Sequence, residues 1–359
     1  MQINNYTPFA GLAWEVVHAN NTWSVSAVAR ARFRLQKSDE LGEIKLSLDP
    51  QQGELFPTDI FWGESDRSSV RYESDLVSFK PNTDLVLNAN AVSPRAKFRR
   101  NWSCGVRVYS EKNELLRSYF LNVFGERKIH KLGVVWWSGF LARVNVVPIR
   151  YEYAKGGTVS IPAKNKRKEK FLKVNRYNPA GCGIKKIRDP KRTAYTPQIL
   201  YRGLPKFTRI PPGFGFINRA WKSRVKLAGT YDKKWIKNQH PLPPHDFDPF
   251  YNQAAHPELI MDGYLKGGSR IELVHLLEGA KKQHFRLPEM RVFTRVKMYT
   301  GEILKEMNID TVLIDIDGEE GKEPGVYISW RASVPRPLEA EATDIMIVPE
   351  KNTTEVKDG

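Results

Sequence analysis

Residues 23–35 read WSVSAVARARFRL and show the period-two alternation that is typical of a β-strand. Successive side chains of a strand point to opposite faces, so every second residue lies on the same face. The pattern therefore predicts a half-buried strand with one apolar face toward the core. That face comprises Val25, Ala27, Ala29, Ala31, Phe33 and Leu35.

Further segments rich in β-branched and aromatic residues recur along the chain, separated by residues that favour turns. They lie at 85–91, 102–108, 119–123, 144–153, 271–275, 285–288, 291–299, 310–315 and 326–330. Short strands at this spacing are typical of β-sandwich or barrel-like folds. We therefore predict a mainly β protein, with helix limited to 248–255 and parts of 216–237.

The length of 359 residues is sufficient for two domains. We predict two packed, β-sandwich-like halves around a central loop region rich in Pro, Gly and aromatic residues. The N-terminal β-rich half covers 1–150 and the C-terminal half covers 151–348. The central loop region is 178–252, and 349–359 form a polar, flexible tail.

The central loop region alternates clusters of Pro and Gly, which favour turns over regular structure. Interleaved aromatic residues favour an ordered surface over a disordered segment. Tyr, Trp and Arg are also the residue types enriched where proteins bind one another. We therefore predict that eleven residues bind a partner or organise the loops: Asn178, Pro179, Gly181, Gly183, Trp221, Arg224, Tyr231, Asp232, Trp235, Asp246 and Asp248.

Positive charge is concentrated in the middle of the chain. Residues 155–240 contain 23 Lys and Arg against 3 Asp and Glu, a net charge of +20 in a chain of net +17. This asymmetry favours an acidic partner such as nucleic acid, although a solvated basic face would have the same composition. The densest run forms a predicted basic patch of Lys164, Lys166, Arg167, Lys168 and Lys170.

The two cysteines, Cys104 and Cys182, show neither disulfide nor metal-finger spacing. Free thiols are typical of a reducing compartment. The N-terminus shows no basic and apolar signal segment, and no run reaches the roughly 18 apolar residues of a membrane span. We expect a cytoplasmic protein with no membrane partner.

Catalytic signatures are missing from the sequence: it contains no phosphate-binding loop, no HExxH and no strand-flanked GxGxxG. One cluster of imidazoles and carboxylates has a composition that can bind zinc or iron. Surrounding prolines prevent a helix from presenting these ligands, and the alternative is that Asp246 and Asp248 cap a short helix. The cluster comprises His240, His245, Asp246, Asp248 and His256. We predict no catalytic residue, metal or cofactor, and retain a metal-dependent hydrolase as the remotest alternative.

An ordered set of short motifs resembles a bacterial domain-of-unknown-function family. The motifs lie at 74–76, 80–84, 125–127, 151–157, 178–183, 212–215, 229–235, 244–248, 285–288, 310–311 and 330–331. Members of that family are encoded beside the spike and effector genes of type VI secretion systems. They are regarded as effector chaperones or adaptors.

The resemblance implies a non-catalytic adaptor that holds a toxin effector. It would load the effector onto the spike protein or onto the cone-shaped protein at the spike tip. The alternative from composition is a basic nucleic-acid-binding module. Under the adaptor hypothesis, nucleic acid binds only non-specifically.

Overall fold

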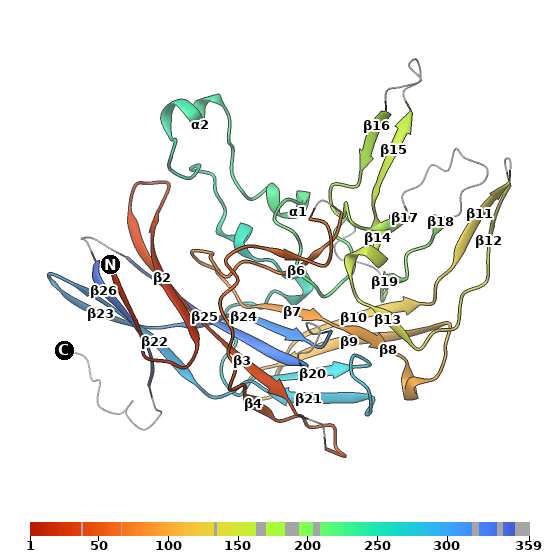
Figure 1. Ribbon diagram of the computed structural model, residues 1–359, viewed down its shortest axis with the longest axis horizontal. Coiled ribbons are helices and arrows are strands. Elements are labelled where there is room, and N and C mark those ends of the chain that lie inside the picture. Colours follow the sequence, from red (N-terminus) through yellow and green to blue (C-terminus); the bar gives the residue numbers. More distant parts are fainter. Residues whose placement is uncertain are drawn as a thin grey trace.

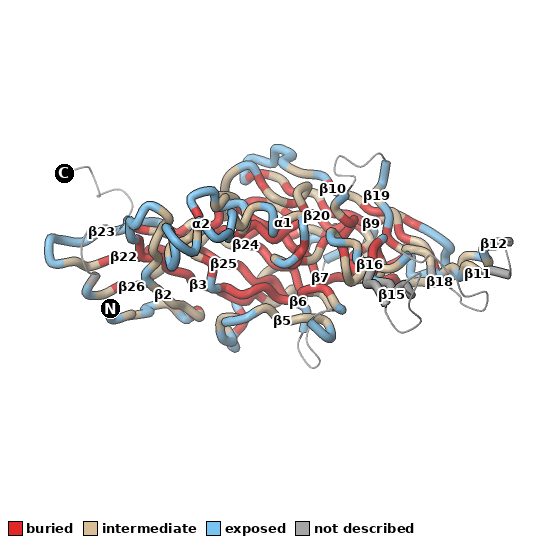
Figure 2. Tube along the Cα trace, turned by 90° about the horizontal axis from the view of Figure 1, so that it is seen from above, coloured by how far each residue is buried: buried red, intermediate tan, exposed pale blue. Residues whose placement is uncertain are grey.

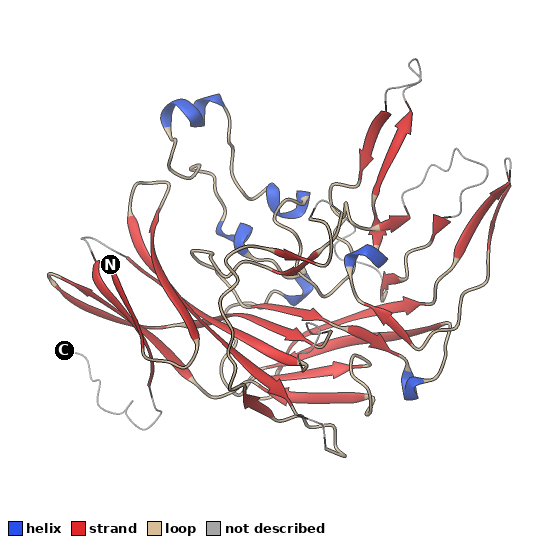
Figure 3. Cartoon of the chain, in the orientation of Figure 1, coloured by secondary structure: helices blue, strands red, loops and turns tan. Residues whose placement is uncertain are grey.

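The fold is described from a computed structural model of the chain (Figure 1). The structure describes residues 1–36, 39–65, 67–132, 135–162, 170–183, 194–203, 209–317, 323–335 and 340–348. Strands predominate and helices are short, which confirms the predicted mainly β class (Figure 3).

The largest sheet has six strands and is built around residues 23–35. It runs in the order β2 (Ala10–Val17), β3 (Trp23–Leu35), β25 (Gly325–Pro335), β24 (Asn308–Asp315) and β7 (Asp84–Asn88), and β4 (Leu46–Leu48) also pairs with β3. Neighbours along this order are antiparallel except β24 and β7, which are parallel. The predicted strand at 23–35 therefore lies inside the sheet, with pairing partners on both sides.

Two further sheets extend the β structure. A five-stranded sheet has the order β19 (Ile199–Tyr201), β10 (Leu115–Phe124), β9 (Asn101–Tyr109), β20 (Arg270–Val274) and β21 (Lys282–Arg286). A four-stranded sheet has the order β1 (Gln2–Asn5), β26 (Ala340–Val348), β22 (Arg291–Met298) and β23 (Gly301–Glu306).

Smaller elements complete the described part of the chain. One three-stranded sheet comprises β12 (Val135–Ser138), β11 (Lys128–Leu132) and β18 (Ala194–Tyr195). The strand pairs are β5 (Ile60–Phe61) with β6 (Val70–Tyr72), β8 (Asn90–Val92) with β13 (Val146–Pro148), β14 (Lys155–Gly156) with β17 (Cys182–Gly183), and β15 (Thr158–Pro162) with β16 (Lys170–Val174). The helices are η1 (Pro94–Ala96), η2 (Tyr151–Tyr153), α1 (Lys222–Val225), α2 (Lys233–Asn238), η3 (Pro249–Asn252) and η4 (Pro257–Leu259).

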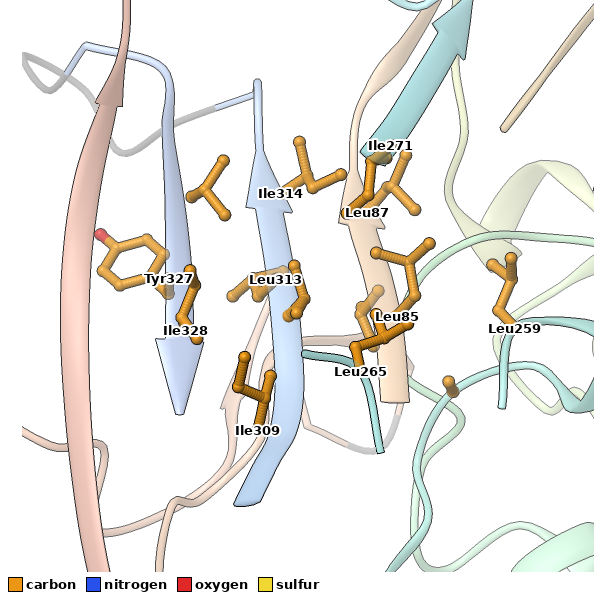
Figure 4. Packing of buried hydrophobic residues seen from close by; sticks show 14 of the residues in the cluster. Leu85, Leu87, Leu259, Leu265, Ile271, Ile309, Leu313, Ile314, Tyr327 and Ile328 are labelled. Atoms are coloured by element: carbon orange, nitrogen blue, oxygen red, sulfur yellow. The ribbon is translucent and has the colours of Figure 1, made fainter. Parts of the chain in front are cut away.

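One hydrophobic core joins the six-stranded and five-stranded sheets. Leu87 of β7 and Ile314 of β24 belong to the same buried cluster as Ile271 of β20, and Figure 4 shows these side chains packed together. Figure 2 shows the buried residues along the middle of an elongated molecule. Burial of apolar surface between these sheets is the main source of stability.

The strand β3 is buried on both faces, so the prediction of a half-buried strand was wrong. Its second face carries Arg30 and Arg32, which are both buried. Arg30 Nη1 lies 2.5 Å from Asp75 Oδ2, and Arg32 forms an ion pair with Asp49. The segment 49–78 covers this second face, and its carboxylates compensate the buried guanidinium groups.

Strands from both predicted halves pair within single sheets. Residues 23–35 pair with 325–335, 84–88 with 311–315, and 105–109 with 270–274. The boundary predicted near residue 150 therefore does not divide one sheet from another, because long-range pairing overrides chain order. The predicted tail at 349–359 lies outside the described residues.

Candidate functional site

Glu73 and Lys80, from the segment between β6 and β7, form a buried ion network with Arg224 of α1. Arg224 Nη1 lies 2.6 Å from Glu73 Oε1. Lys80 Nζ lies 3.8 Å from Glu73 Oε2 and 2.8 Å from Asp84 Oδ2. Burial alone would lower the pKa of Lys80, but the carboxylates of Asp84 and Glu73 hold that pKa above its usual value. Lys80 therefore remains charged at neutral pH.

A second buried ion pair joins the two central strands of the six-stranded sheet. Arg331 of β25 lies with Nε 2.5 Å from Oδ2 of Asp310 in β24, and its Nη1 donates to the carbonyl of Val77. The neighbouring Thr311 hydroxyl lies 3.1 Å from Lys80 Nζ and links the pair to the Glu73 network. Motif residues from 80–84, 310–311 and 330–331 thus meet in one place, although they are distant in the sequence.

Trp221 and Arg224 are buried, so they organise the loops and do not form an exposed surface. Arg224 donates to the carbonyls of Ile217 and Tyr251 as well as to Glu73. The Trp221 ring packs edge-on against Tyr151 at 5.3 Å between centroids. Arg224 therefore fixes the central loop region onto the segment that precedes β7.

The turn at Asn178 is also structural. Asn178 is fully buried, and its Nδ2 donates to the carbonyl of Tyr151 at 2.9 Å. A Cβ atom added at Gly181 would lie 2.4 Å from Asn178 Nδ2, so only glycine fits against the amide. The Pro179 carbonyl accepts a hydrogen bond from Thr158, and Gly183 ends β17 with a φ of +88°. These contacts pack the turn against β14.

Residues 226–248, which we call the projecting loop, carry α2 away from the sheets (Figure 1). At its base, the Asp248 N–H donates to the carbonyl of Leu227. Both carboxylate oxygens of Asp246 accept hydrogen bonds from Thr230, which lowers the Asp246 pKa. Asp232 caps α2, accepting from the Trp235 N–H at 2.9 Å. These four hydrogen bonds within the projecting loop fix its shape, since the loop has little core of its own.

Trp235 holds the projecting loop together. Its Nε1 donates to the carbonyl of Leu242 at 2.9 Å. The rings of Tyr231 and His240 pack edge-on against the Trp235 ring, with centroid separations of 4.7 Å and 5.3 Å. Gln239 Nε2 donates to the carbonyl of Ala19 in the β2–β3 turn, which connects the loop to the largest sheet.

The outer surface of the projecting loop combines apolar and positively charged side chains. Tyr231 is 58% exposed and Ile236 is 63% exposed. Lys233, Lys234 and Lys237 of α2 are exposed beside them. Of the eleven predicted residues, Tyr231 is the one that presents a large hydrophobic surface, while Asp232, Trp235 and Asp246 maintain the geometry beneath it.

The chain matches the model of the family described as "Uncharacterized protein conserved in bacteria (DUF2169)" over residues 20–331. The chain belongs to this family. The expectation of a conserved bacterial family is therefore confirmed. No curated protein and no solved structure matches the chain.

The region matched to the family contains both buried ion networks, the Asn178 turn and the whole projecting loop. It ends before β26, whose strand pairs in parallel with β1. It also begins after β2, so it covers most of the largest sheet but not all of it. Among the helices that the structure describes, none is long and apolar enough to cross a membrane.

The His and Asp residues that were weighed as a metal site do not form a cluster in the structure. His256 is buried with its ring stacked on Tyr119, and Nε2 lies 3.0 Å from the Tyr201 hydroxyl. Burial lowers the pKa of His256 to about 3, so the ring is neutral at physiological pH. Asp248 caps η3 as predicted, whereas Asp246 bonds to Thr230. Within the described ranges, no three His, Cys, Asp or Glu side chains lie close enough to hold a metal ion.

The predicted basic patch is outside the described residues at Lys164, Lys166, Arg167 and Lys168, and Lys170 begins β16. The structure reveals a different positive site that sequence reasoning missed. We call it the basic hollow, and it is lined by Lys97, Phe98, Arg99, Arg100, Asn101 and Arg143. The run Lys97–Arg100 was the only local signal, because Arg143 joins it through pairing between distant segments.

Proposed function

We propose that the chain is a cytoplasmic, non-catalytic adaptor that binds a cognate type VI secretion effector and loads it onto the spike protein or its cone-shaped tip protein. The observation that carries this proposal is the projecting loop, which presents Tyr231 and Ile236 on a rigid frame. The resemblance of the ordered motifs supports the same function. Family membership fits the proposal without specifying a partner.

The structure of the projecting loop suits protein binding. A loop that is already ordered loses little conformational freedom on association. Burying exposed apolar side chains such as Ile236 at the centre of an interface contributes about 1.5–3 kcal/mol each. The lysines of α2 would accelerate encounter with an acidic partner surface. An effector would therefore contact the apolar residues and be oriented by the surrounding charge.

The deciding experiment is co-expression of the chain with effectors encoded beside it, followed by affinity capture. We expect the complex to survive a wash at about 0.5 M salt, because apolar contacts are screened little while phosphate contacts weaken steeply. Ile236→Asp should reduce effector affinity by about 30-fold or more, as expected for a central interface residue. Loss of the effector during the wash would count against an apolar interface.

Leu304→Asp provides the matched control. Leu304 lies on the edge strand β23, outside the projecting loop, and is also about half exposed. It should retain the effector. If Ile236→Asp retains the effector as well as Leu304→Asp does, the projecting loop is not the binding surface.

A nucleic-acid-binding module is the second candidate, and it is favoured by the net charge of +20 over residues 155–240. Non-specific binding of DNA to such a surface has a Kd of about 10⁻⁴ to 10⁻⁶ M at physiological salt. Weak binding would therefore not distinguish the two functions. Tight DNA binding that persists at about 0.5 M salt, with no protein partner captured, would replace the adaptor proposal.

A further inference from the structure

The basic hollow has a volume of about 630 Å³ and is formed by two segments that lie before β9 and before β13. Four of its six lining residues are Lys97, Arg99, Arg100 and Arg143, and all four side chains are exposed. Among the residues that the structure describes, no Asp or Glu forms an ion pair with any of the four. Their positive charges are therefore available to a ligand.

Backbone hydrogen bonds hold the two segments of the basic hollow in register. The Arg99 N–H donates to the Val144 carbonyl at 2.8 Å, and the Val144 N–H donates back to Arg99 at 2.9 Å. Arg143 Nη2 donates to the carbonyl of Phe98 at 3.3 Å. The segments that carry Arg99 and Arg143 are therefore fixed to each other before any ligand binds, which reduces the ordering cost of binding.

The turn that leads into the basic hollow has an unusual backbone. Arg95 and Ala96 are consecutive non-glycine residues in the left-handed region, with φ of 59° and 51°. L-residues rarely adopt this conformation, and such residues gather at functional sites. Two hydrogen bonds maintain the turn. The Ala96 N–H donates to the Ser93 carbonyl, and the Ser93 N–H donates to the Asn145 carbonyl. The fold thus holds a costly turn beside a group of uncompensated cations.

We propose that the basic hollow binds an acidic peptide segment of a protein partner, and that Phe98 contacts an apolar residue within that segment. Arginine guanidinium groups bind carboxylates through paired hydrogen bonds. Phe98 is 62% exposed at the edge of the same hollow, so it offers an apolar contact next to the charges. The combination recognises a segment in which carboxylates flank a hydrophobic side chain.

The location of the basic hollow favours a short peptide over a polynucleotide. High affinity for nucleic acid requires a track of several phosphate contacts. The lysines of α2 cannot extend the hollow into such a track, because the turn between β8 and β9, which contains η1 and precedes the hollow, lies far from α2 (Figure 1). This proposal does not depend on the projecting loop or on the adaptor function.

The test uses the full chain and a labelled oligoglutamate peptide that carries one leucine, with binding followed by fluorescence anisotropy at about 50 mM salt. Arg99→Glu/Arg143→Glu should weaken binding by about tenfold or more, because two attractive charges become repulsive. The control Lys233→Glu/Lys237→Glu makes the same change in net charge on α2 and should weaken binding by less than about threefold. All four substituted side chains are exposed, and circular dichroism will verify that both variants remain folded.

A second variant tests the apolar contact. Phe98→Ala should weaken binding of the leucine-containing peptide by about threefold or more, and should leave a leucine-free oligoglutamate unaffected. Equal weakening by both charge-reversal variants would overturn the proposal, since net charge alone would then explain binding. The proposal would also be overturned if a labelled oligothymidylate bound more tightly than the peptide and lost affinity in the Arg99→Glu/Arg143→Glu variant.

Discussion

Removing Arg331 is expected to destabilise the protein strongly, because its partner Asp310 would be left as a buried, uncompensated charge. The two side chains are 3% and 1% exposed, and Nε lies 2.5 Å from Oδ2. In Arg331→Met, the hydroxyl of Thr311 is the neighbour that still donates to the Asp310 carboxylate. Loss of one member of such a pair costs about 3–5 kcal/mol.

The reverse substitution provides the second side of a double-mutant cycle. Asp310→Leu leaves the Arg331 guanidinium with the Val77 carbonyl as an acceptor, and we again expect a loss of about 3–5 kcal/mol. The double variant Arg331→Met/Asp310→Leu contains neither charge. Its main loss is the hydrogen bond to Val77, which costs about 1–3 kcal/mol. The double variant should therefore lose at least about 3 kcal/mol less than the sum of the single variants.

Urea unfolding followed by tryptophan fluorescence measures the four free energies of unfolding. Arg291→Met serves as a control, because Arg291 and Glu306 form an exposed ion pair with the same separation of 2.5 Å. That substitution should cost less than about 1 kcal/mol. If the losses of the two single variants add to within about 0.5 kcal/mol in the double variant, the two charges do not compensate each other and the reasoning is refuted.

Three further predictions concern other parts of the chain. Burial lowers the pKa of His256 from 6.5 to about 3, so protons bind preferentially to the unfolded chain in this range. Between about pH 7 and pH 5, the free energy of unfolding of the unsubstituted protein should therefore fall by about 2 kcal/mol more than that of His256→Gln. Equal losses in urea titrations would contradict this. Asp232→Ala removes the cap of α2 and should lower the free energy of local opening of residues 233–238 by about 1 kcal/mol, without changing the free energy of global unfolding. Hydrogen exchange of these amides should therefore be faster, and an equal acceleration across the whole chain would exclude a local cap. Cys104 is fully buried, which raises its thiol pKa, so a thiol reagent should modify only Cys182 in the folded protein; two rapid equivalents would show that Cys104 is accessible.

The alternation at 23–35 was sufficient to predict a strand but not its environment. Arg30 and Arg32 are charged residues, and charged residues usually face water. Their burial depends on Asp75 and Asp49, which reach β3 from a separate segment. Sequence periodicity contains no information about such distant partners. The strands β2 and β26 were also missed, since their apolar and polar residues alternate less regularly.

The candidate site was predictable to a similar extent. The turn-forming residues and aromatic residues of the central loop region indicated an ordered segment, and Asp232 and Asp248 do cap short helices. The depth of each side chain could not be predicted, because Trp221 and Tyr231 are both aromatic residues of the central loop region, yet Trp221 is buried and Tyr231 is exposed. The basic hollow required the pairing of Arg99 with Val144, a contact between segments that only the folded chain brings together.

The position of β25 between β3 and β24 has a consequence for the synthesis of this protein in cells. A ribosome that adds about 5–20 residues per second needs roughly 15–60 s to pass from the end of β3 at Leu35 to the start of β25 at Gly325. Throughout that interval one edge of β3 has no strand to pair with, and its alanine-rich face is accessible to other nascent chains. We therefore expect that the yield of folded protein depends on protection of this edge during translation, and that slowing elongation before Gly325 increases aggregation even though the finished sheets are stable.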